Sequence, residues 1–335
     1  MTGRDGWANI NETCLVLDGR ARDRRERDGR ARDQTTNGSH LSMSELAVIT
    51  PSFRGDAEIF SDLHRSVLEF TPVDTVHHVF VPKKDKPLFA RYEGPRCRVW
   101  TSAELLPSRY LRIGRGDSYV NVRRPWPPVR GWISQQAIKI AAAAQLDADV
   151  VVVADSDIVL VRPVGVERFT AAGQRLIYRE DNGVNAGMER HLIWHRVARE
   201  LFGLPPAPPP PLPDYVSSFN FWEPAVVRAM RQRIQDTTGR DWLDAFTAQL
   251  HISEFMLYGI FVDEVLDAGG SRREADTTVC HNTWQTTPMD HDEAIAFVDR
   301  LSPAAVAMMI SAKSHTPIDV RRAAIERCAA IVKSG

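Results

Sequence analysis

The sequence has few cysteines, no long apolar run and almost no net charge. Its four cysteines are scattered and none is spaced as Cys-x-x-Cys, which argues against a disulfide framework or a zinc knuckle and favours a reducing compartment. No apolar run approaches the roughly 20 residues of a membrane-spanning helix. The apolar stretch Cys14-Leu15-Val16-Leu17 is too short for the core of a signal peptide. We therefore expect a cytoplasmic protein with no membrane span.

The charge balance argues against nucleic acid as a partner. The 42 Lys and Arg residues nearly cancel the 43 Asp and Glu residues, so no overall basic field is present. Residues 1–44 form a polar segment in which Gly-Arg-Ala-Arg-Asp occurs at Gly19 and again at Gly29. Such a segment buries too little apolar surface to offset its ordering entropy. We predict a disordered N-terminal extension.

From residue 45 onward the pattern predicts an α/β fold. Apolar strands are expected at 46–50, 76–81, 97–100 and 150–153, with an amphipathic helix at 57–70 and a further helix at 131–142. Residues 109–130 are expected to be irregular. Later segments predict a strand at 215–222 and helices beginning near residues 224, 242, 253, 303 and 317, the last two because proline suits the first position of a helix.

Two carboxylates follow the most apolar strand of the chain. Four consecutive valines precede Asp155-Ser156-Asp157, and such a run is typical of a strand buried on both faces. Side chains two residues apart on an extended chain point the same way, so Asp155 and Asp157 can face one ligand. Open α/β sheets bind ligands at the carboxyl edge of their strands, and carboxylate oxygens suit Mg²⁺ or Mn²⁺. An ordinary solvated loop is the alternative interpretation.

Two further groups of residues are candidates for the same site. Gln135 and Lys139 lie one turn apart on the helix before the valine strand, where they form either a solvated face or a polar face under the acids. Ser253 can cap a helix that places Glu254 in its first turn. Glu254 is then either a helper of the cap or a poised catalytic carboxylate.

These motifs, taken in order, resemble the GT-A-type nucleotide-sugar glycosyltransferases, and most closely a bacterial family of that type that is described as a domain of unknown function. The resemblance covers roughly residues 45 to 284. It is carried by Thr50-Pro51-Ser52 with Asp56, Gly131-Trp132 with Gln135-Gln136 and Lys139, Asp155-Ser156-Asp157, and Ser253-Glu254-Phe255 with Leu257-Tyr258-Gly259.

The resemblance implies a GT-A-like fold, a single large domain with a mostly parallel sheet. Residues 45–162 would form the nucleotide-sugar-binding half and residues 163–335 the acceptor-binding half. Asp155 and Asp157 would hold Mn²⁺ or Mg²⁺, with His281, or else His315, as a further ligand. Glu254 would be the catalytic residue. The nucleotide sugar would contact Thr50, Pro51, Ser52, Arg54, Asp56, Gln135, Lys139 and Ser156.

The implied activity is metal-dependent transfer of a sugar from a nucleoside-diphosphate sugar to a small-molecule or glycan acceptor. A haloacid dehalogenase-like phosphohydrolase is the main alternative, with Asp155 as nucleophile and Asp157 as general acid and base. That motif usually opens its fold, whereas about 100 residues precede it here. Nucleotidyl transfer and non-catalytic binding of a sugar nucleotide are further alternatives. The sequence does not indicate the sugar, the base, the acceptor or the stereochemistry.

Overall fold

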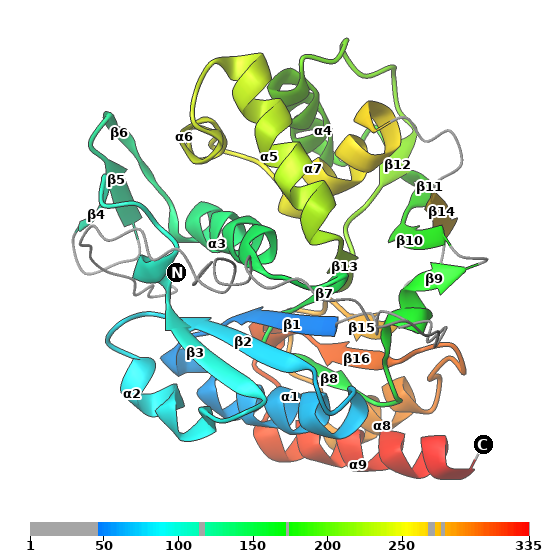
Figure 1. Cartoon of the computed structure of the whole chain (residues 1–335). Coiled ribbons are helices and arrows are strands. Elements are labelled where there is room, and N and C mark those ends of the chain that lie inside the picture. The colour runs from blue at the N-terminus through cyan, green and yellow to red at the C-terminus, as the bar shows by residue number, and fades with distance from the viewer. Residues whose placement is uncertain (1–45, 114–117, 172–173, 267–271, 276–278, 335) are drawn as a thin grey trace, which may run out of the picture.

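The computed structural model describes residues 46–113, 118–171, 174–266, 272–275 and 279–334. The predicted N-terminal extension lies outside these residues. The predicted α/β class is confirmed, since a central sheet with the strand order β13–β7–β1–β2–β3 is covered by helices on both faces (Figure 1). The five strands are β1 (Leu46–Pro51), β2 (Val76–Val81), β3 (Cys97–Thr101), β7 (Val150–Ala154) and β13 (Phe219–Trp222). Only β13 pairs antiparallel with its neighbour in this sheet.

Alternate side chains of the inner strands pack into two separate cores. Val151 and Val153 of β7 join the larger core, whereas Val150 and Val152 join a second core on the opposite face. This two-sided burial explains the unbroken run of valines. In Figure 1, helices α3 (Gly131–Gln145), α4 (Glu189–Phe202), α5 (Pro224–Thr238), α6 (Trp242–Thr247) and α7 (Glu254–Ile260) lie above the sheet. Helices α1 (Ala57–Phe70), α2 (Lys86–Phe89), α8 (His291–Val298) and α9 (Ile318–Ser334) lie below it.

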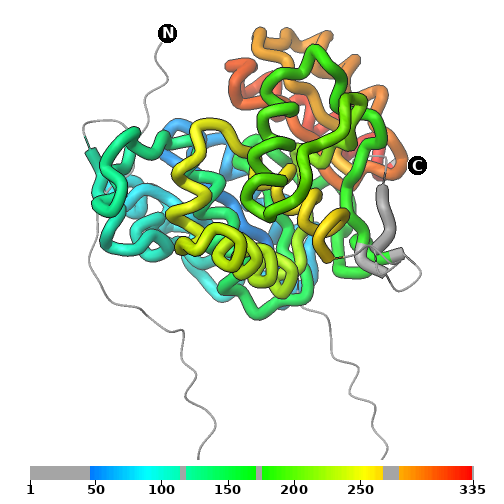
Figure 2. The backbone as a smooth tube through the Cα atoms, turned by 90° about the horizontal axis from the view of Figure 1, so that it is seen from above, coloured from blue at the N-terminus to red at the C-terminus, as the bar shows by residue number. Residues whose placement is uncertain are grey.

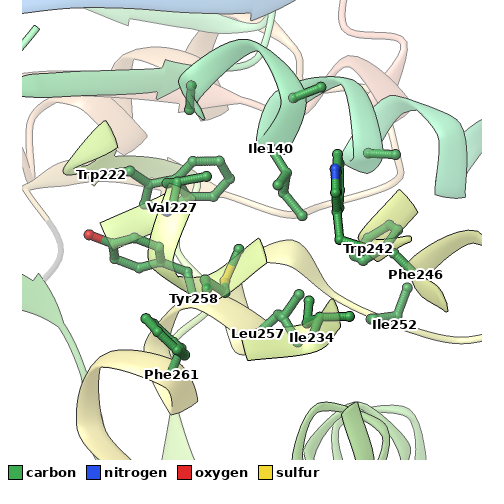
Figure 3. Close-up of a cluster of buried hydrophobic side chains, with 14 of the residues drawn as sticks. Ile140, Trp222, Val227, Ile234, Trp242, Phe246, Ile252, Leu257, Tyr258 and Phe261 are labelled. Carbon is green, nitrogen blue, oxygen red and sulfur yellow. The ribbon is translucent and has the colours of Figure 1, made fainter. Parts of the chain in front are cut away.

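The larger core joins α3 to the helices of the C-terminal half. Figure 3 shows Ile140 of α3 facing side chains from β13, α5, α6, α7 and the adjoining turns. Burying such aliphatic and aromatic side chains contributes about 1.5–3 kcal/mol each. Because α3 is held from both sides, the residues that it carries have fixed positions. The other labelled residues are Trp222, Val227, Ile234, Trp242, Phe246, Ile252, Leu257, Tyr258 and Phe261.

Smaller sheets surround the central one. A three-stranded sheet of β15 (Cys280–Thr283), β16 (Ala307–Ile310) and β8 (Ile158–Leu160) follows the two acids and is backed by α8 and α9. The predicted helix near residue 303 is wrong, since Pro303 lies in a turn that leads into β16. The remaining strands are β9 (Thr170–Ala171), β10 (Gln174–Tyr178) and β14 (Arg272–Ala275) in one sheet, and β11 (Glu180–Val184) with β12 (Leu212–Asp214) in another.

The segment expected to be irregular forms an antiparallel sheet instead. It consists of β4 (Tyr110–Ile113), β5 (Ser118–Asn121) and β6 (Arg124–Val129). Asp244 of α6 anchors this sheet, because its Oδ1 accepts hydrogen bonds from Arg109 Nε (2.8 Å), Tyr110 Oη (2.7 Å) and Asn121 Nδ2 (2.8 Å). Seen from above in Figure 2, this teal segment and the orange-red C-terminal helices lie at opposite ends of the molecule.

None of the helices in the described parts of the chain combines the length and the apolar content that crossing a membrane requires.

Candidate active site

Asp155, Lys139 and Glu254 meet at the carboxyl end of β7. Lys139 Nζ lies 2.9 Å from Asp155 Oδ1 and 3.0 Å from Glu254 Oε1. The side chains of Lys139 and Glu254 are each 5% exposed, whereas that of Asp155 is 45% exposed. The structure therefore brings together three of the site residues predicted from the sequence. Of these three side chains, only that of Asp155 is exposed to solvent.

The charge on Lys139 is maintained by its two partners. Burial alone would lower the pKa of this lysine, but the negative charges of Asp155 and Glu254 outweigh burial and raise the pKa above its ordinary value. Burial also raises the pKa of Glu254, and Lys139 opposes that shift. The lysine consequently stays protonated in a site where an unpaired buried cation would be very costly.

Helix α7 begins where the sequence predicted. Ser253 is its N-cap, and the Ser253 hydroxyl accepts a hydrogen bond from the Met256 N–H at 3.3 Å. The backbone N–H of Glu254 donates to Gln136 Oε1 of α3 at 2.8 Å. Gln136, which follows Gln135 in the chain, was not predicted as a site residue. Its hydrogen bond to Glu254 depends on the packing of α3 against α7, which the sequence does not show.

Asp157 occupies a different environment from Asp155. A tight turn follows β7, closed by a hydrogen bond from Ile158 N–H to the Asp155 carbonyl oxygen (3.1 Å). Asp157 Oδ2 accepts a hydrogen bond from Ala312 N–H at 2.7 Å. Asp157 Oδ1 is buried and has no hydrogen-bond partner among the residues that the structure describes. Burial, followed by repulsion from Asp155, raises the pKa of Asp157 to about 6.

The loop after β1 lies against the same turn. Ser156 Oγ and Ser52 Oγ are hydrogen-bonded at 2.9 Å, which joins the ends of β1 and β7. Burial, followed by the negative charges of Asp157 and Asp155, raises the pKa of Asp56 to about 7, and the positive charge of Arg321 opposes this increase. Asp56 is therefore close enough to both acids to feel their charge, as expected for residues at one sheet edge.

Other residues that were predicted to bind the nucleotide sugar have hydrogen-bond partners within the protein. Thr50 Oγ1 is hydrogen-bonded to His77 Nε2 inside the protein at 2.9 Å, and Pro51 is the buried last residue of β1. Arg54 binds Asp85 through its backbone N–H (3.0 Å) and its Nε (3.3 Å), while its side chain stays 68% exposed. Gln135 is half-buried, and no hydrogen bond of its amide is formed within the described residues.

The two candidate histidines differ in their surroundings. The ring of His281 stacks on Phe297 with centroids 4.2 Å apart, and its Nε2–H donates to the Phe297 carbonyl oxygen at 2.8 Å. His315 is exposed and ends the turn that begins with Ala312, the residue that hydrogen-bonds to Asp157. The structure thus places the turn of His315, rather than the ring of His281, beside the acids. Metal ligation by either histidine stays a prediction.

The donor set suits a divalent cation, although no convergent group of three or more His, Cys, Asp or Glu side chains is found in the described ranges. The buried, unpartnered Oδ1 of Asp157 is a hard oxygen of the kind that Mg²⁺ and Mn²⁺ prefer. Asp155, Asp56 and the cation Arg321 interact electrostatically with Asp157, and Asp155 is also in contact with Lys139, which pairs with Glu254. The excess of negative charge favours a bound cation.

A profile of a family of unknown function, DUF6492, matches residues 46–326. The chain belongs to this family. The predicted resemblance to a family described as a domain of unknown function is thus confirmed. No curated protein matches the DUF6492 chain in sequence.

Several solved glycosyltransferase structures are similar to this DUF6492 protein. Mouse xyloside xylosyltransferase 1 has a TM-score of 0.45 at 15% identity, with 82% of this chain and 99% of that chain covered. The bifunctional glycosyltransferase WbbM has a TM-score of 0.45 at 10% identity, with 88% of this chain but only 52% of that chain covered. The galactosyltransferase LgtC, in complex with donor and acceptor sugar analogues, has a TM-score of 0.42 at 12% identity, with 86% and 95% covered.

Proposed function

We propose that this protein is a metal-dependent glycosyltransferase that moves a sugar from a nucleoside-diphosphate sugar to an acceptor hydroxyl. The observation that carries the proposal is the meeting of Asp155, Lys139 and Glu254 at the carboxyl end of β7, beside Asp157. Open α/β sheets bind ligands at this edge. A lysine held between two carboxylates there supplies a fixed positive charge for a phosphate group.

Asp155 and Asp157 would hold Mn²⁺ or Mg²⁺ through their carboxylate oxygens. When bound, such an ion acts as a Lewis acid toward the phosphate oxygens of the donor. The ammonium group of Lys139 would stabilise the negative charge that develops on the departing diphosphate. Because Lys139 is fixed by two buried contacts, this stabilisation needs no rearrangement during the reaction.

The loop after β1 would bind the nucleoside of the donor. Ser52 is joined to Ser156 by a hydrogen bond, so the loop and the acid-bearing turn keep their relative position. Pro51 and Asp56 flank the same loop, and Arg54 extends an exposed guanidinium from it. A basic side chain at that place suits contact with a phosphate.

Glu254 would serve the reaction through Lys139. Its carboxylate is 5% exposed and contacts the lysine at 3.0 Å, so its most direct effect is to keep Lys139 charged and in place. We therefore propose Glu254 as a positioning residue. Its action as general base or nucleophile, predicted from the sequence, stays a prediction.

The proposal is tested by screening nucleotide sugars with Mn²⁺ in a thermal-shift assay, followed by NMR of the reaction products. A donor that binds the folded state raises the apparent melting temperature by mass action. We expect at least one nucleotide sugar to stabilise the protein only when Mn²⁺ is present, and to be consumed. Absence of any such donor, together with metal-dependent hydrolysis of p-nitrophenyl phosphate, would favour the phosphohydrolase alternative instead.

A further inference from the structure

Helix α3 is buried along almost its whole length, yet one side of its first turn is open to solvent. From Ile133 to Ala144 every residue is buried except the half-buried Gln135, while Trp132 before them is 42% exposed. Residues three and four apart share a face of a helix, so Trp132, Gln135 and Lys139 form a stripe along one side of α3 that is exposed at Trp132 and buried at Lys139. Trp132 is therefore an exposed aromatic ring on the same side of α3 as Lys139.

The stripe leads to the candidate active site. Gln136 lies one turn after Trp132, and its Nε2 donates to the Trp132 carbonyl oxygen at 3.3 Å while its Oε1 accepts from Glu254 N–H at 2.8 Å. One turn further, Lys139 contacts Glu254 and Asp155. Seven residues of α-helix span about 10.5 Å, so Trp132 is roughly that far along the helix axis from Lys139.

The indole of Trp132 belongs to a group of rings at this end of α3. Trp194 of α4 lies beside it, with ring centroids 5.9 Å apart and planes inclined by 30°. His191 packs on Trp194 at 4.6 Å, and its Nε2 lies 3.6 Å from Asp214 Oδ2. The Nε1 of Trp194 is buried and finds no hydrogen-bond partner within the described ranges. We call Trp132 and Trp194 the aromatic shelf.

We propose that the aromatic shelf is the platform on which a sugar ring of the acceptor stacks, with the Gln135 amide hydrogen-bonding to its hydroxyl groups. This inference rests on the proposed function. A pyranose presents an apolar C–H face and a rim of hydroxyls, so it needs an aromatic surface together with uncharged polar groups. Trp132 supplies the surface, and the amide of Gln135, which has no hydrogen-bond partner among the described residues, supplies both a donor and an acceptor.

The position of the shelf fits the acceptor better than the donor. The diphosphate end of the donor is assigned to Lys139, Asp155 and Asp157, at the far end of the stripe. A ring stacked on Trp132 lies toward the solvent end, from which an acceptor arrives. The acceptor is accordingly a glycoside or glycan rather than a protein side chain or a lipid alcohol.

Saturation-transfer NMR with the purified full chain tests the platform directly. The probes are the methyl α- and β-pyranosides of glucose, galactose, mannose and xylose, each with and without Mn²⁺ and nucleoside diphosphate. We expect at least one glycoside to receive saturation in the wild type, and Trp132→Ala to weaken its binding by roughly 2- to 12-fold, the range of one ring-stacking contact. Trp132→Phe should keep part of the binding.

Trp126→Ala is the matched control, because Trp126 is 79% exposed and has no ring contact among the described residues. It should leave glycoside binding unchanged. The proposal is overturned if no glycoside binds the wild type, if Trp132→Ala binds as well as the wild type, or if Trp126→Ala loses as much.

Calorimetry with nucleoside diphosphates and nucleotide sugars distinguishes whether the ring that stacks on the shelf belongs to the donor or to the acceptor. We expect Trp132→Ala to bind both kinds of nucleotide as the wild type does. If the variant loses affinity for nucleotide sugars but not for nucleoside diphosphates, the shelf binds the donor sugar and the acceptor assignment is wrong. If the wild type binds no nucleotide at all, the proposed transferase activity fails, and glycoside binding at Trp132 would then stand as a separate carbohydrate site.

Discussion

Lys139 Nζ lies 2.9 Å from Asp155 Oδ1 and thereby ties the middle of α3 to the end of β7. The same ammonium group contacts Glu254, so one buried cation connects elements from both halves of the chain. Removing one partner from a buried ion pair leaves an uncompensated charge, which costs more than the pair itself contributes. The stability of the protein should therefore depend strongly on Lys139.

We expect Lys139→Met to lower the free energy of unfolding by about 3–5 kcal/mol. Methionine fills a similar volume, so the loss reflects the unpaired Glu254 rather than a cavity. Urea denaturation monitored by circular dichroism measures it. Adding Glu254→Gln should restore part of the loss, because a neutral amide needs no counter-charge. A Lys139→Met protein within ~1 kcal/mol of the wild type, the typical cost of any point substitution, would show that the pair is not needed for stability.

Glu254→Gln keeps the shape of the side chain and removes the charge that holds Lys139. We expect turnover of the donor to fall at least ~100-fold, the scale of losing one preorganised electrostatic contact in the transition state, while folding and nucleotide binding survive. Glu264→Gln is the matched control, since Glu264 is also a carboxylate paired with a cation, at 2.6 Å from Arg199 Nη1. Initial rates with saturating donor report the effect. Near-normal turnover in Glu254→Gln, or an equal loss in Glu264→Gln, would contradict the assigned role.

Gly259 of α7 is required by close packing. A Cβ atom at this position would lie 2.1 Å from Cγ of the Tyr215 ring, so α7 or the tyrosine would have to move. Overpacking a core typically costs 1–3 kcal/mol, and we expect Gly259→Ala to lose about that much stability or more. Gly94→Ala is the control, because its Cβ would meet nothing closer than 4.0 Å. Equal melting temperatures for the two variants would refute the packing argument.

Two histidines, the buried His64 and the half-buried His78, make a contribution to stability that is lost in acid. Burial, with a smaller contribution from Arg96, lowers the pKa of His64 to about 4, and burial with Arg98 lowers that of His78 to about 4. Unfolded histidines titrate near 6.5, so between these values the unfolded chain binds more protons. The stability that these two histidines contribute is then fully present above about pH 6.5 and is lost as the pH falls toward about 4. Asp56 and Asp157, whose pKa values are raised to about 7 and about 6, contribute in the opposite direction, so the effect of His64 is measured as the difference between the wild type and a variant.

Urea denaturation at a series of pH values between 7.5 and 4.5 measures this dependence. His64→Phe removes one titrating ring and keeps an aromatic group beside Phe60 and Tyr92. We expect this variant to be less stable at pH 7.5, because it leaves His77 Nδ1 without its 3.1 Å partner, but to lose less stability on acidification. An unchanged slope in the variant would mean that His64 does not stay neutral in the folded state.

Local patterns in the sequence were sufficient to predict the central sheet and part of the candidate active site. The valine run predicts β7, and the spacing of Gln135 and Lys139 predicts a helix face that the structure brings to Asp155. The cap by Ser253 was also predictable, because capping depends on neighbouring residues alone. What the sequence did not indicate was the charge contact between Lys139 and Glu254, which are 115 residues apart.

The errors occurred where distant residues decide the local structure. Residues 124–129 contain three prolines and read as irregular, yet they form β6 because β5 pairs with them and Asp244 holds the neighbouring strand. Ser302-Pro303 suits a helix start as well as a turn, and the pairing of β16 with β8 and β15 decides for the turn. The N–H of Ala312 reaches Asp157 across 155 residues, and no short-range pattern could have indicated it.

Calorimetric titration of nucleoside diphosphates into the protein, with and without Mn²⁺, tests the central claim most directly. We predict that the wild type binds at least one of them only when Mn²⁺ is present, and that Asp155→Asn and Asp157→Asn each abolish this binding. Asp147→Asn, at an exposed position before β7, should bind as the wild type does. Unchanged affinity in both the Asp155 and the Asp157 variant would contradict the account.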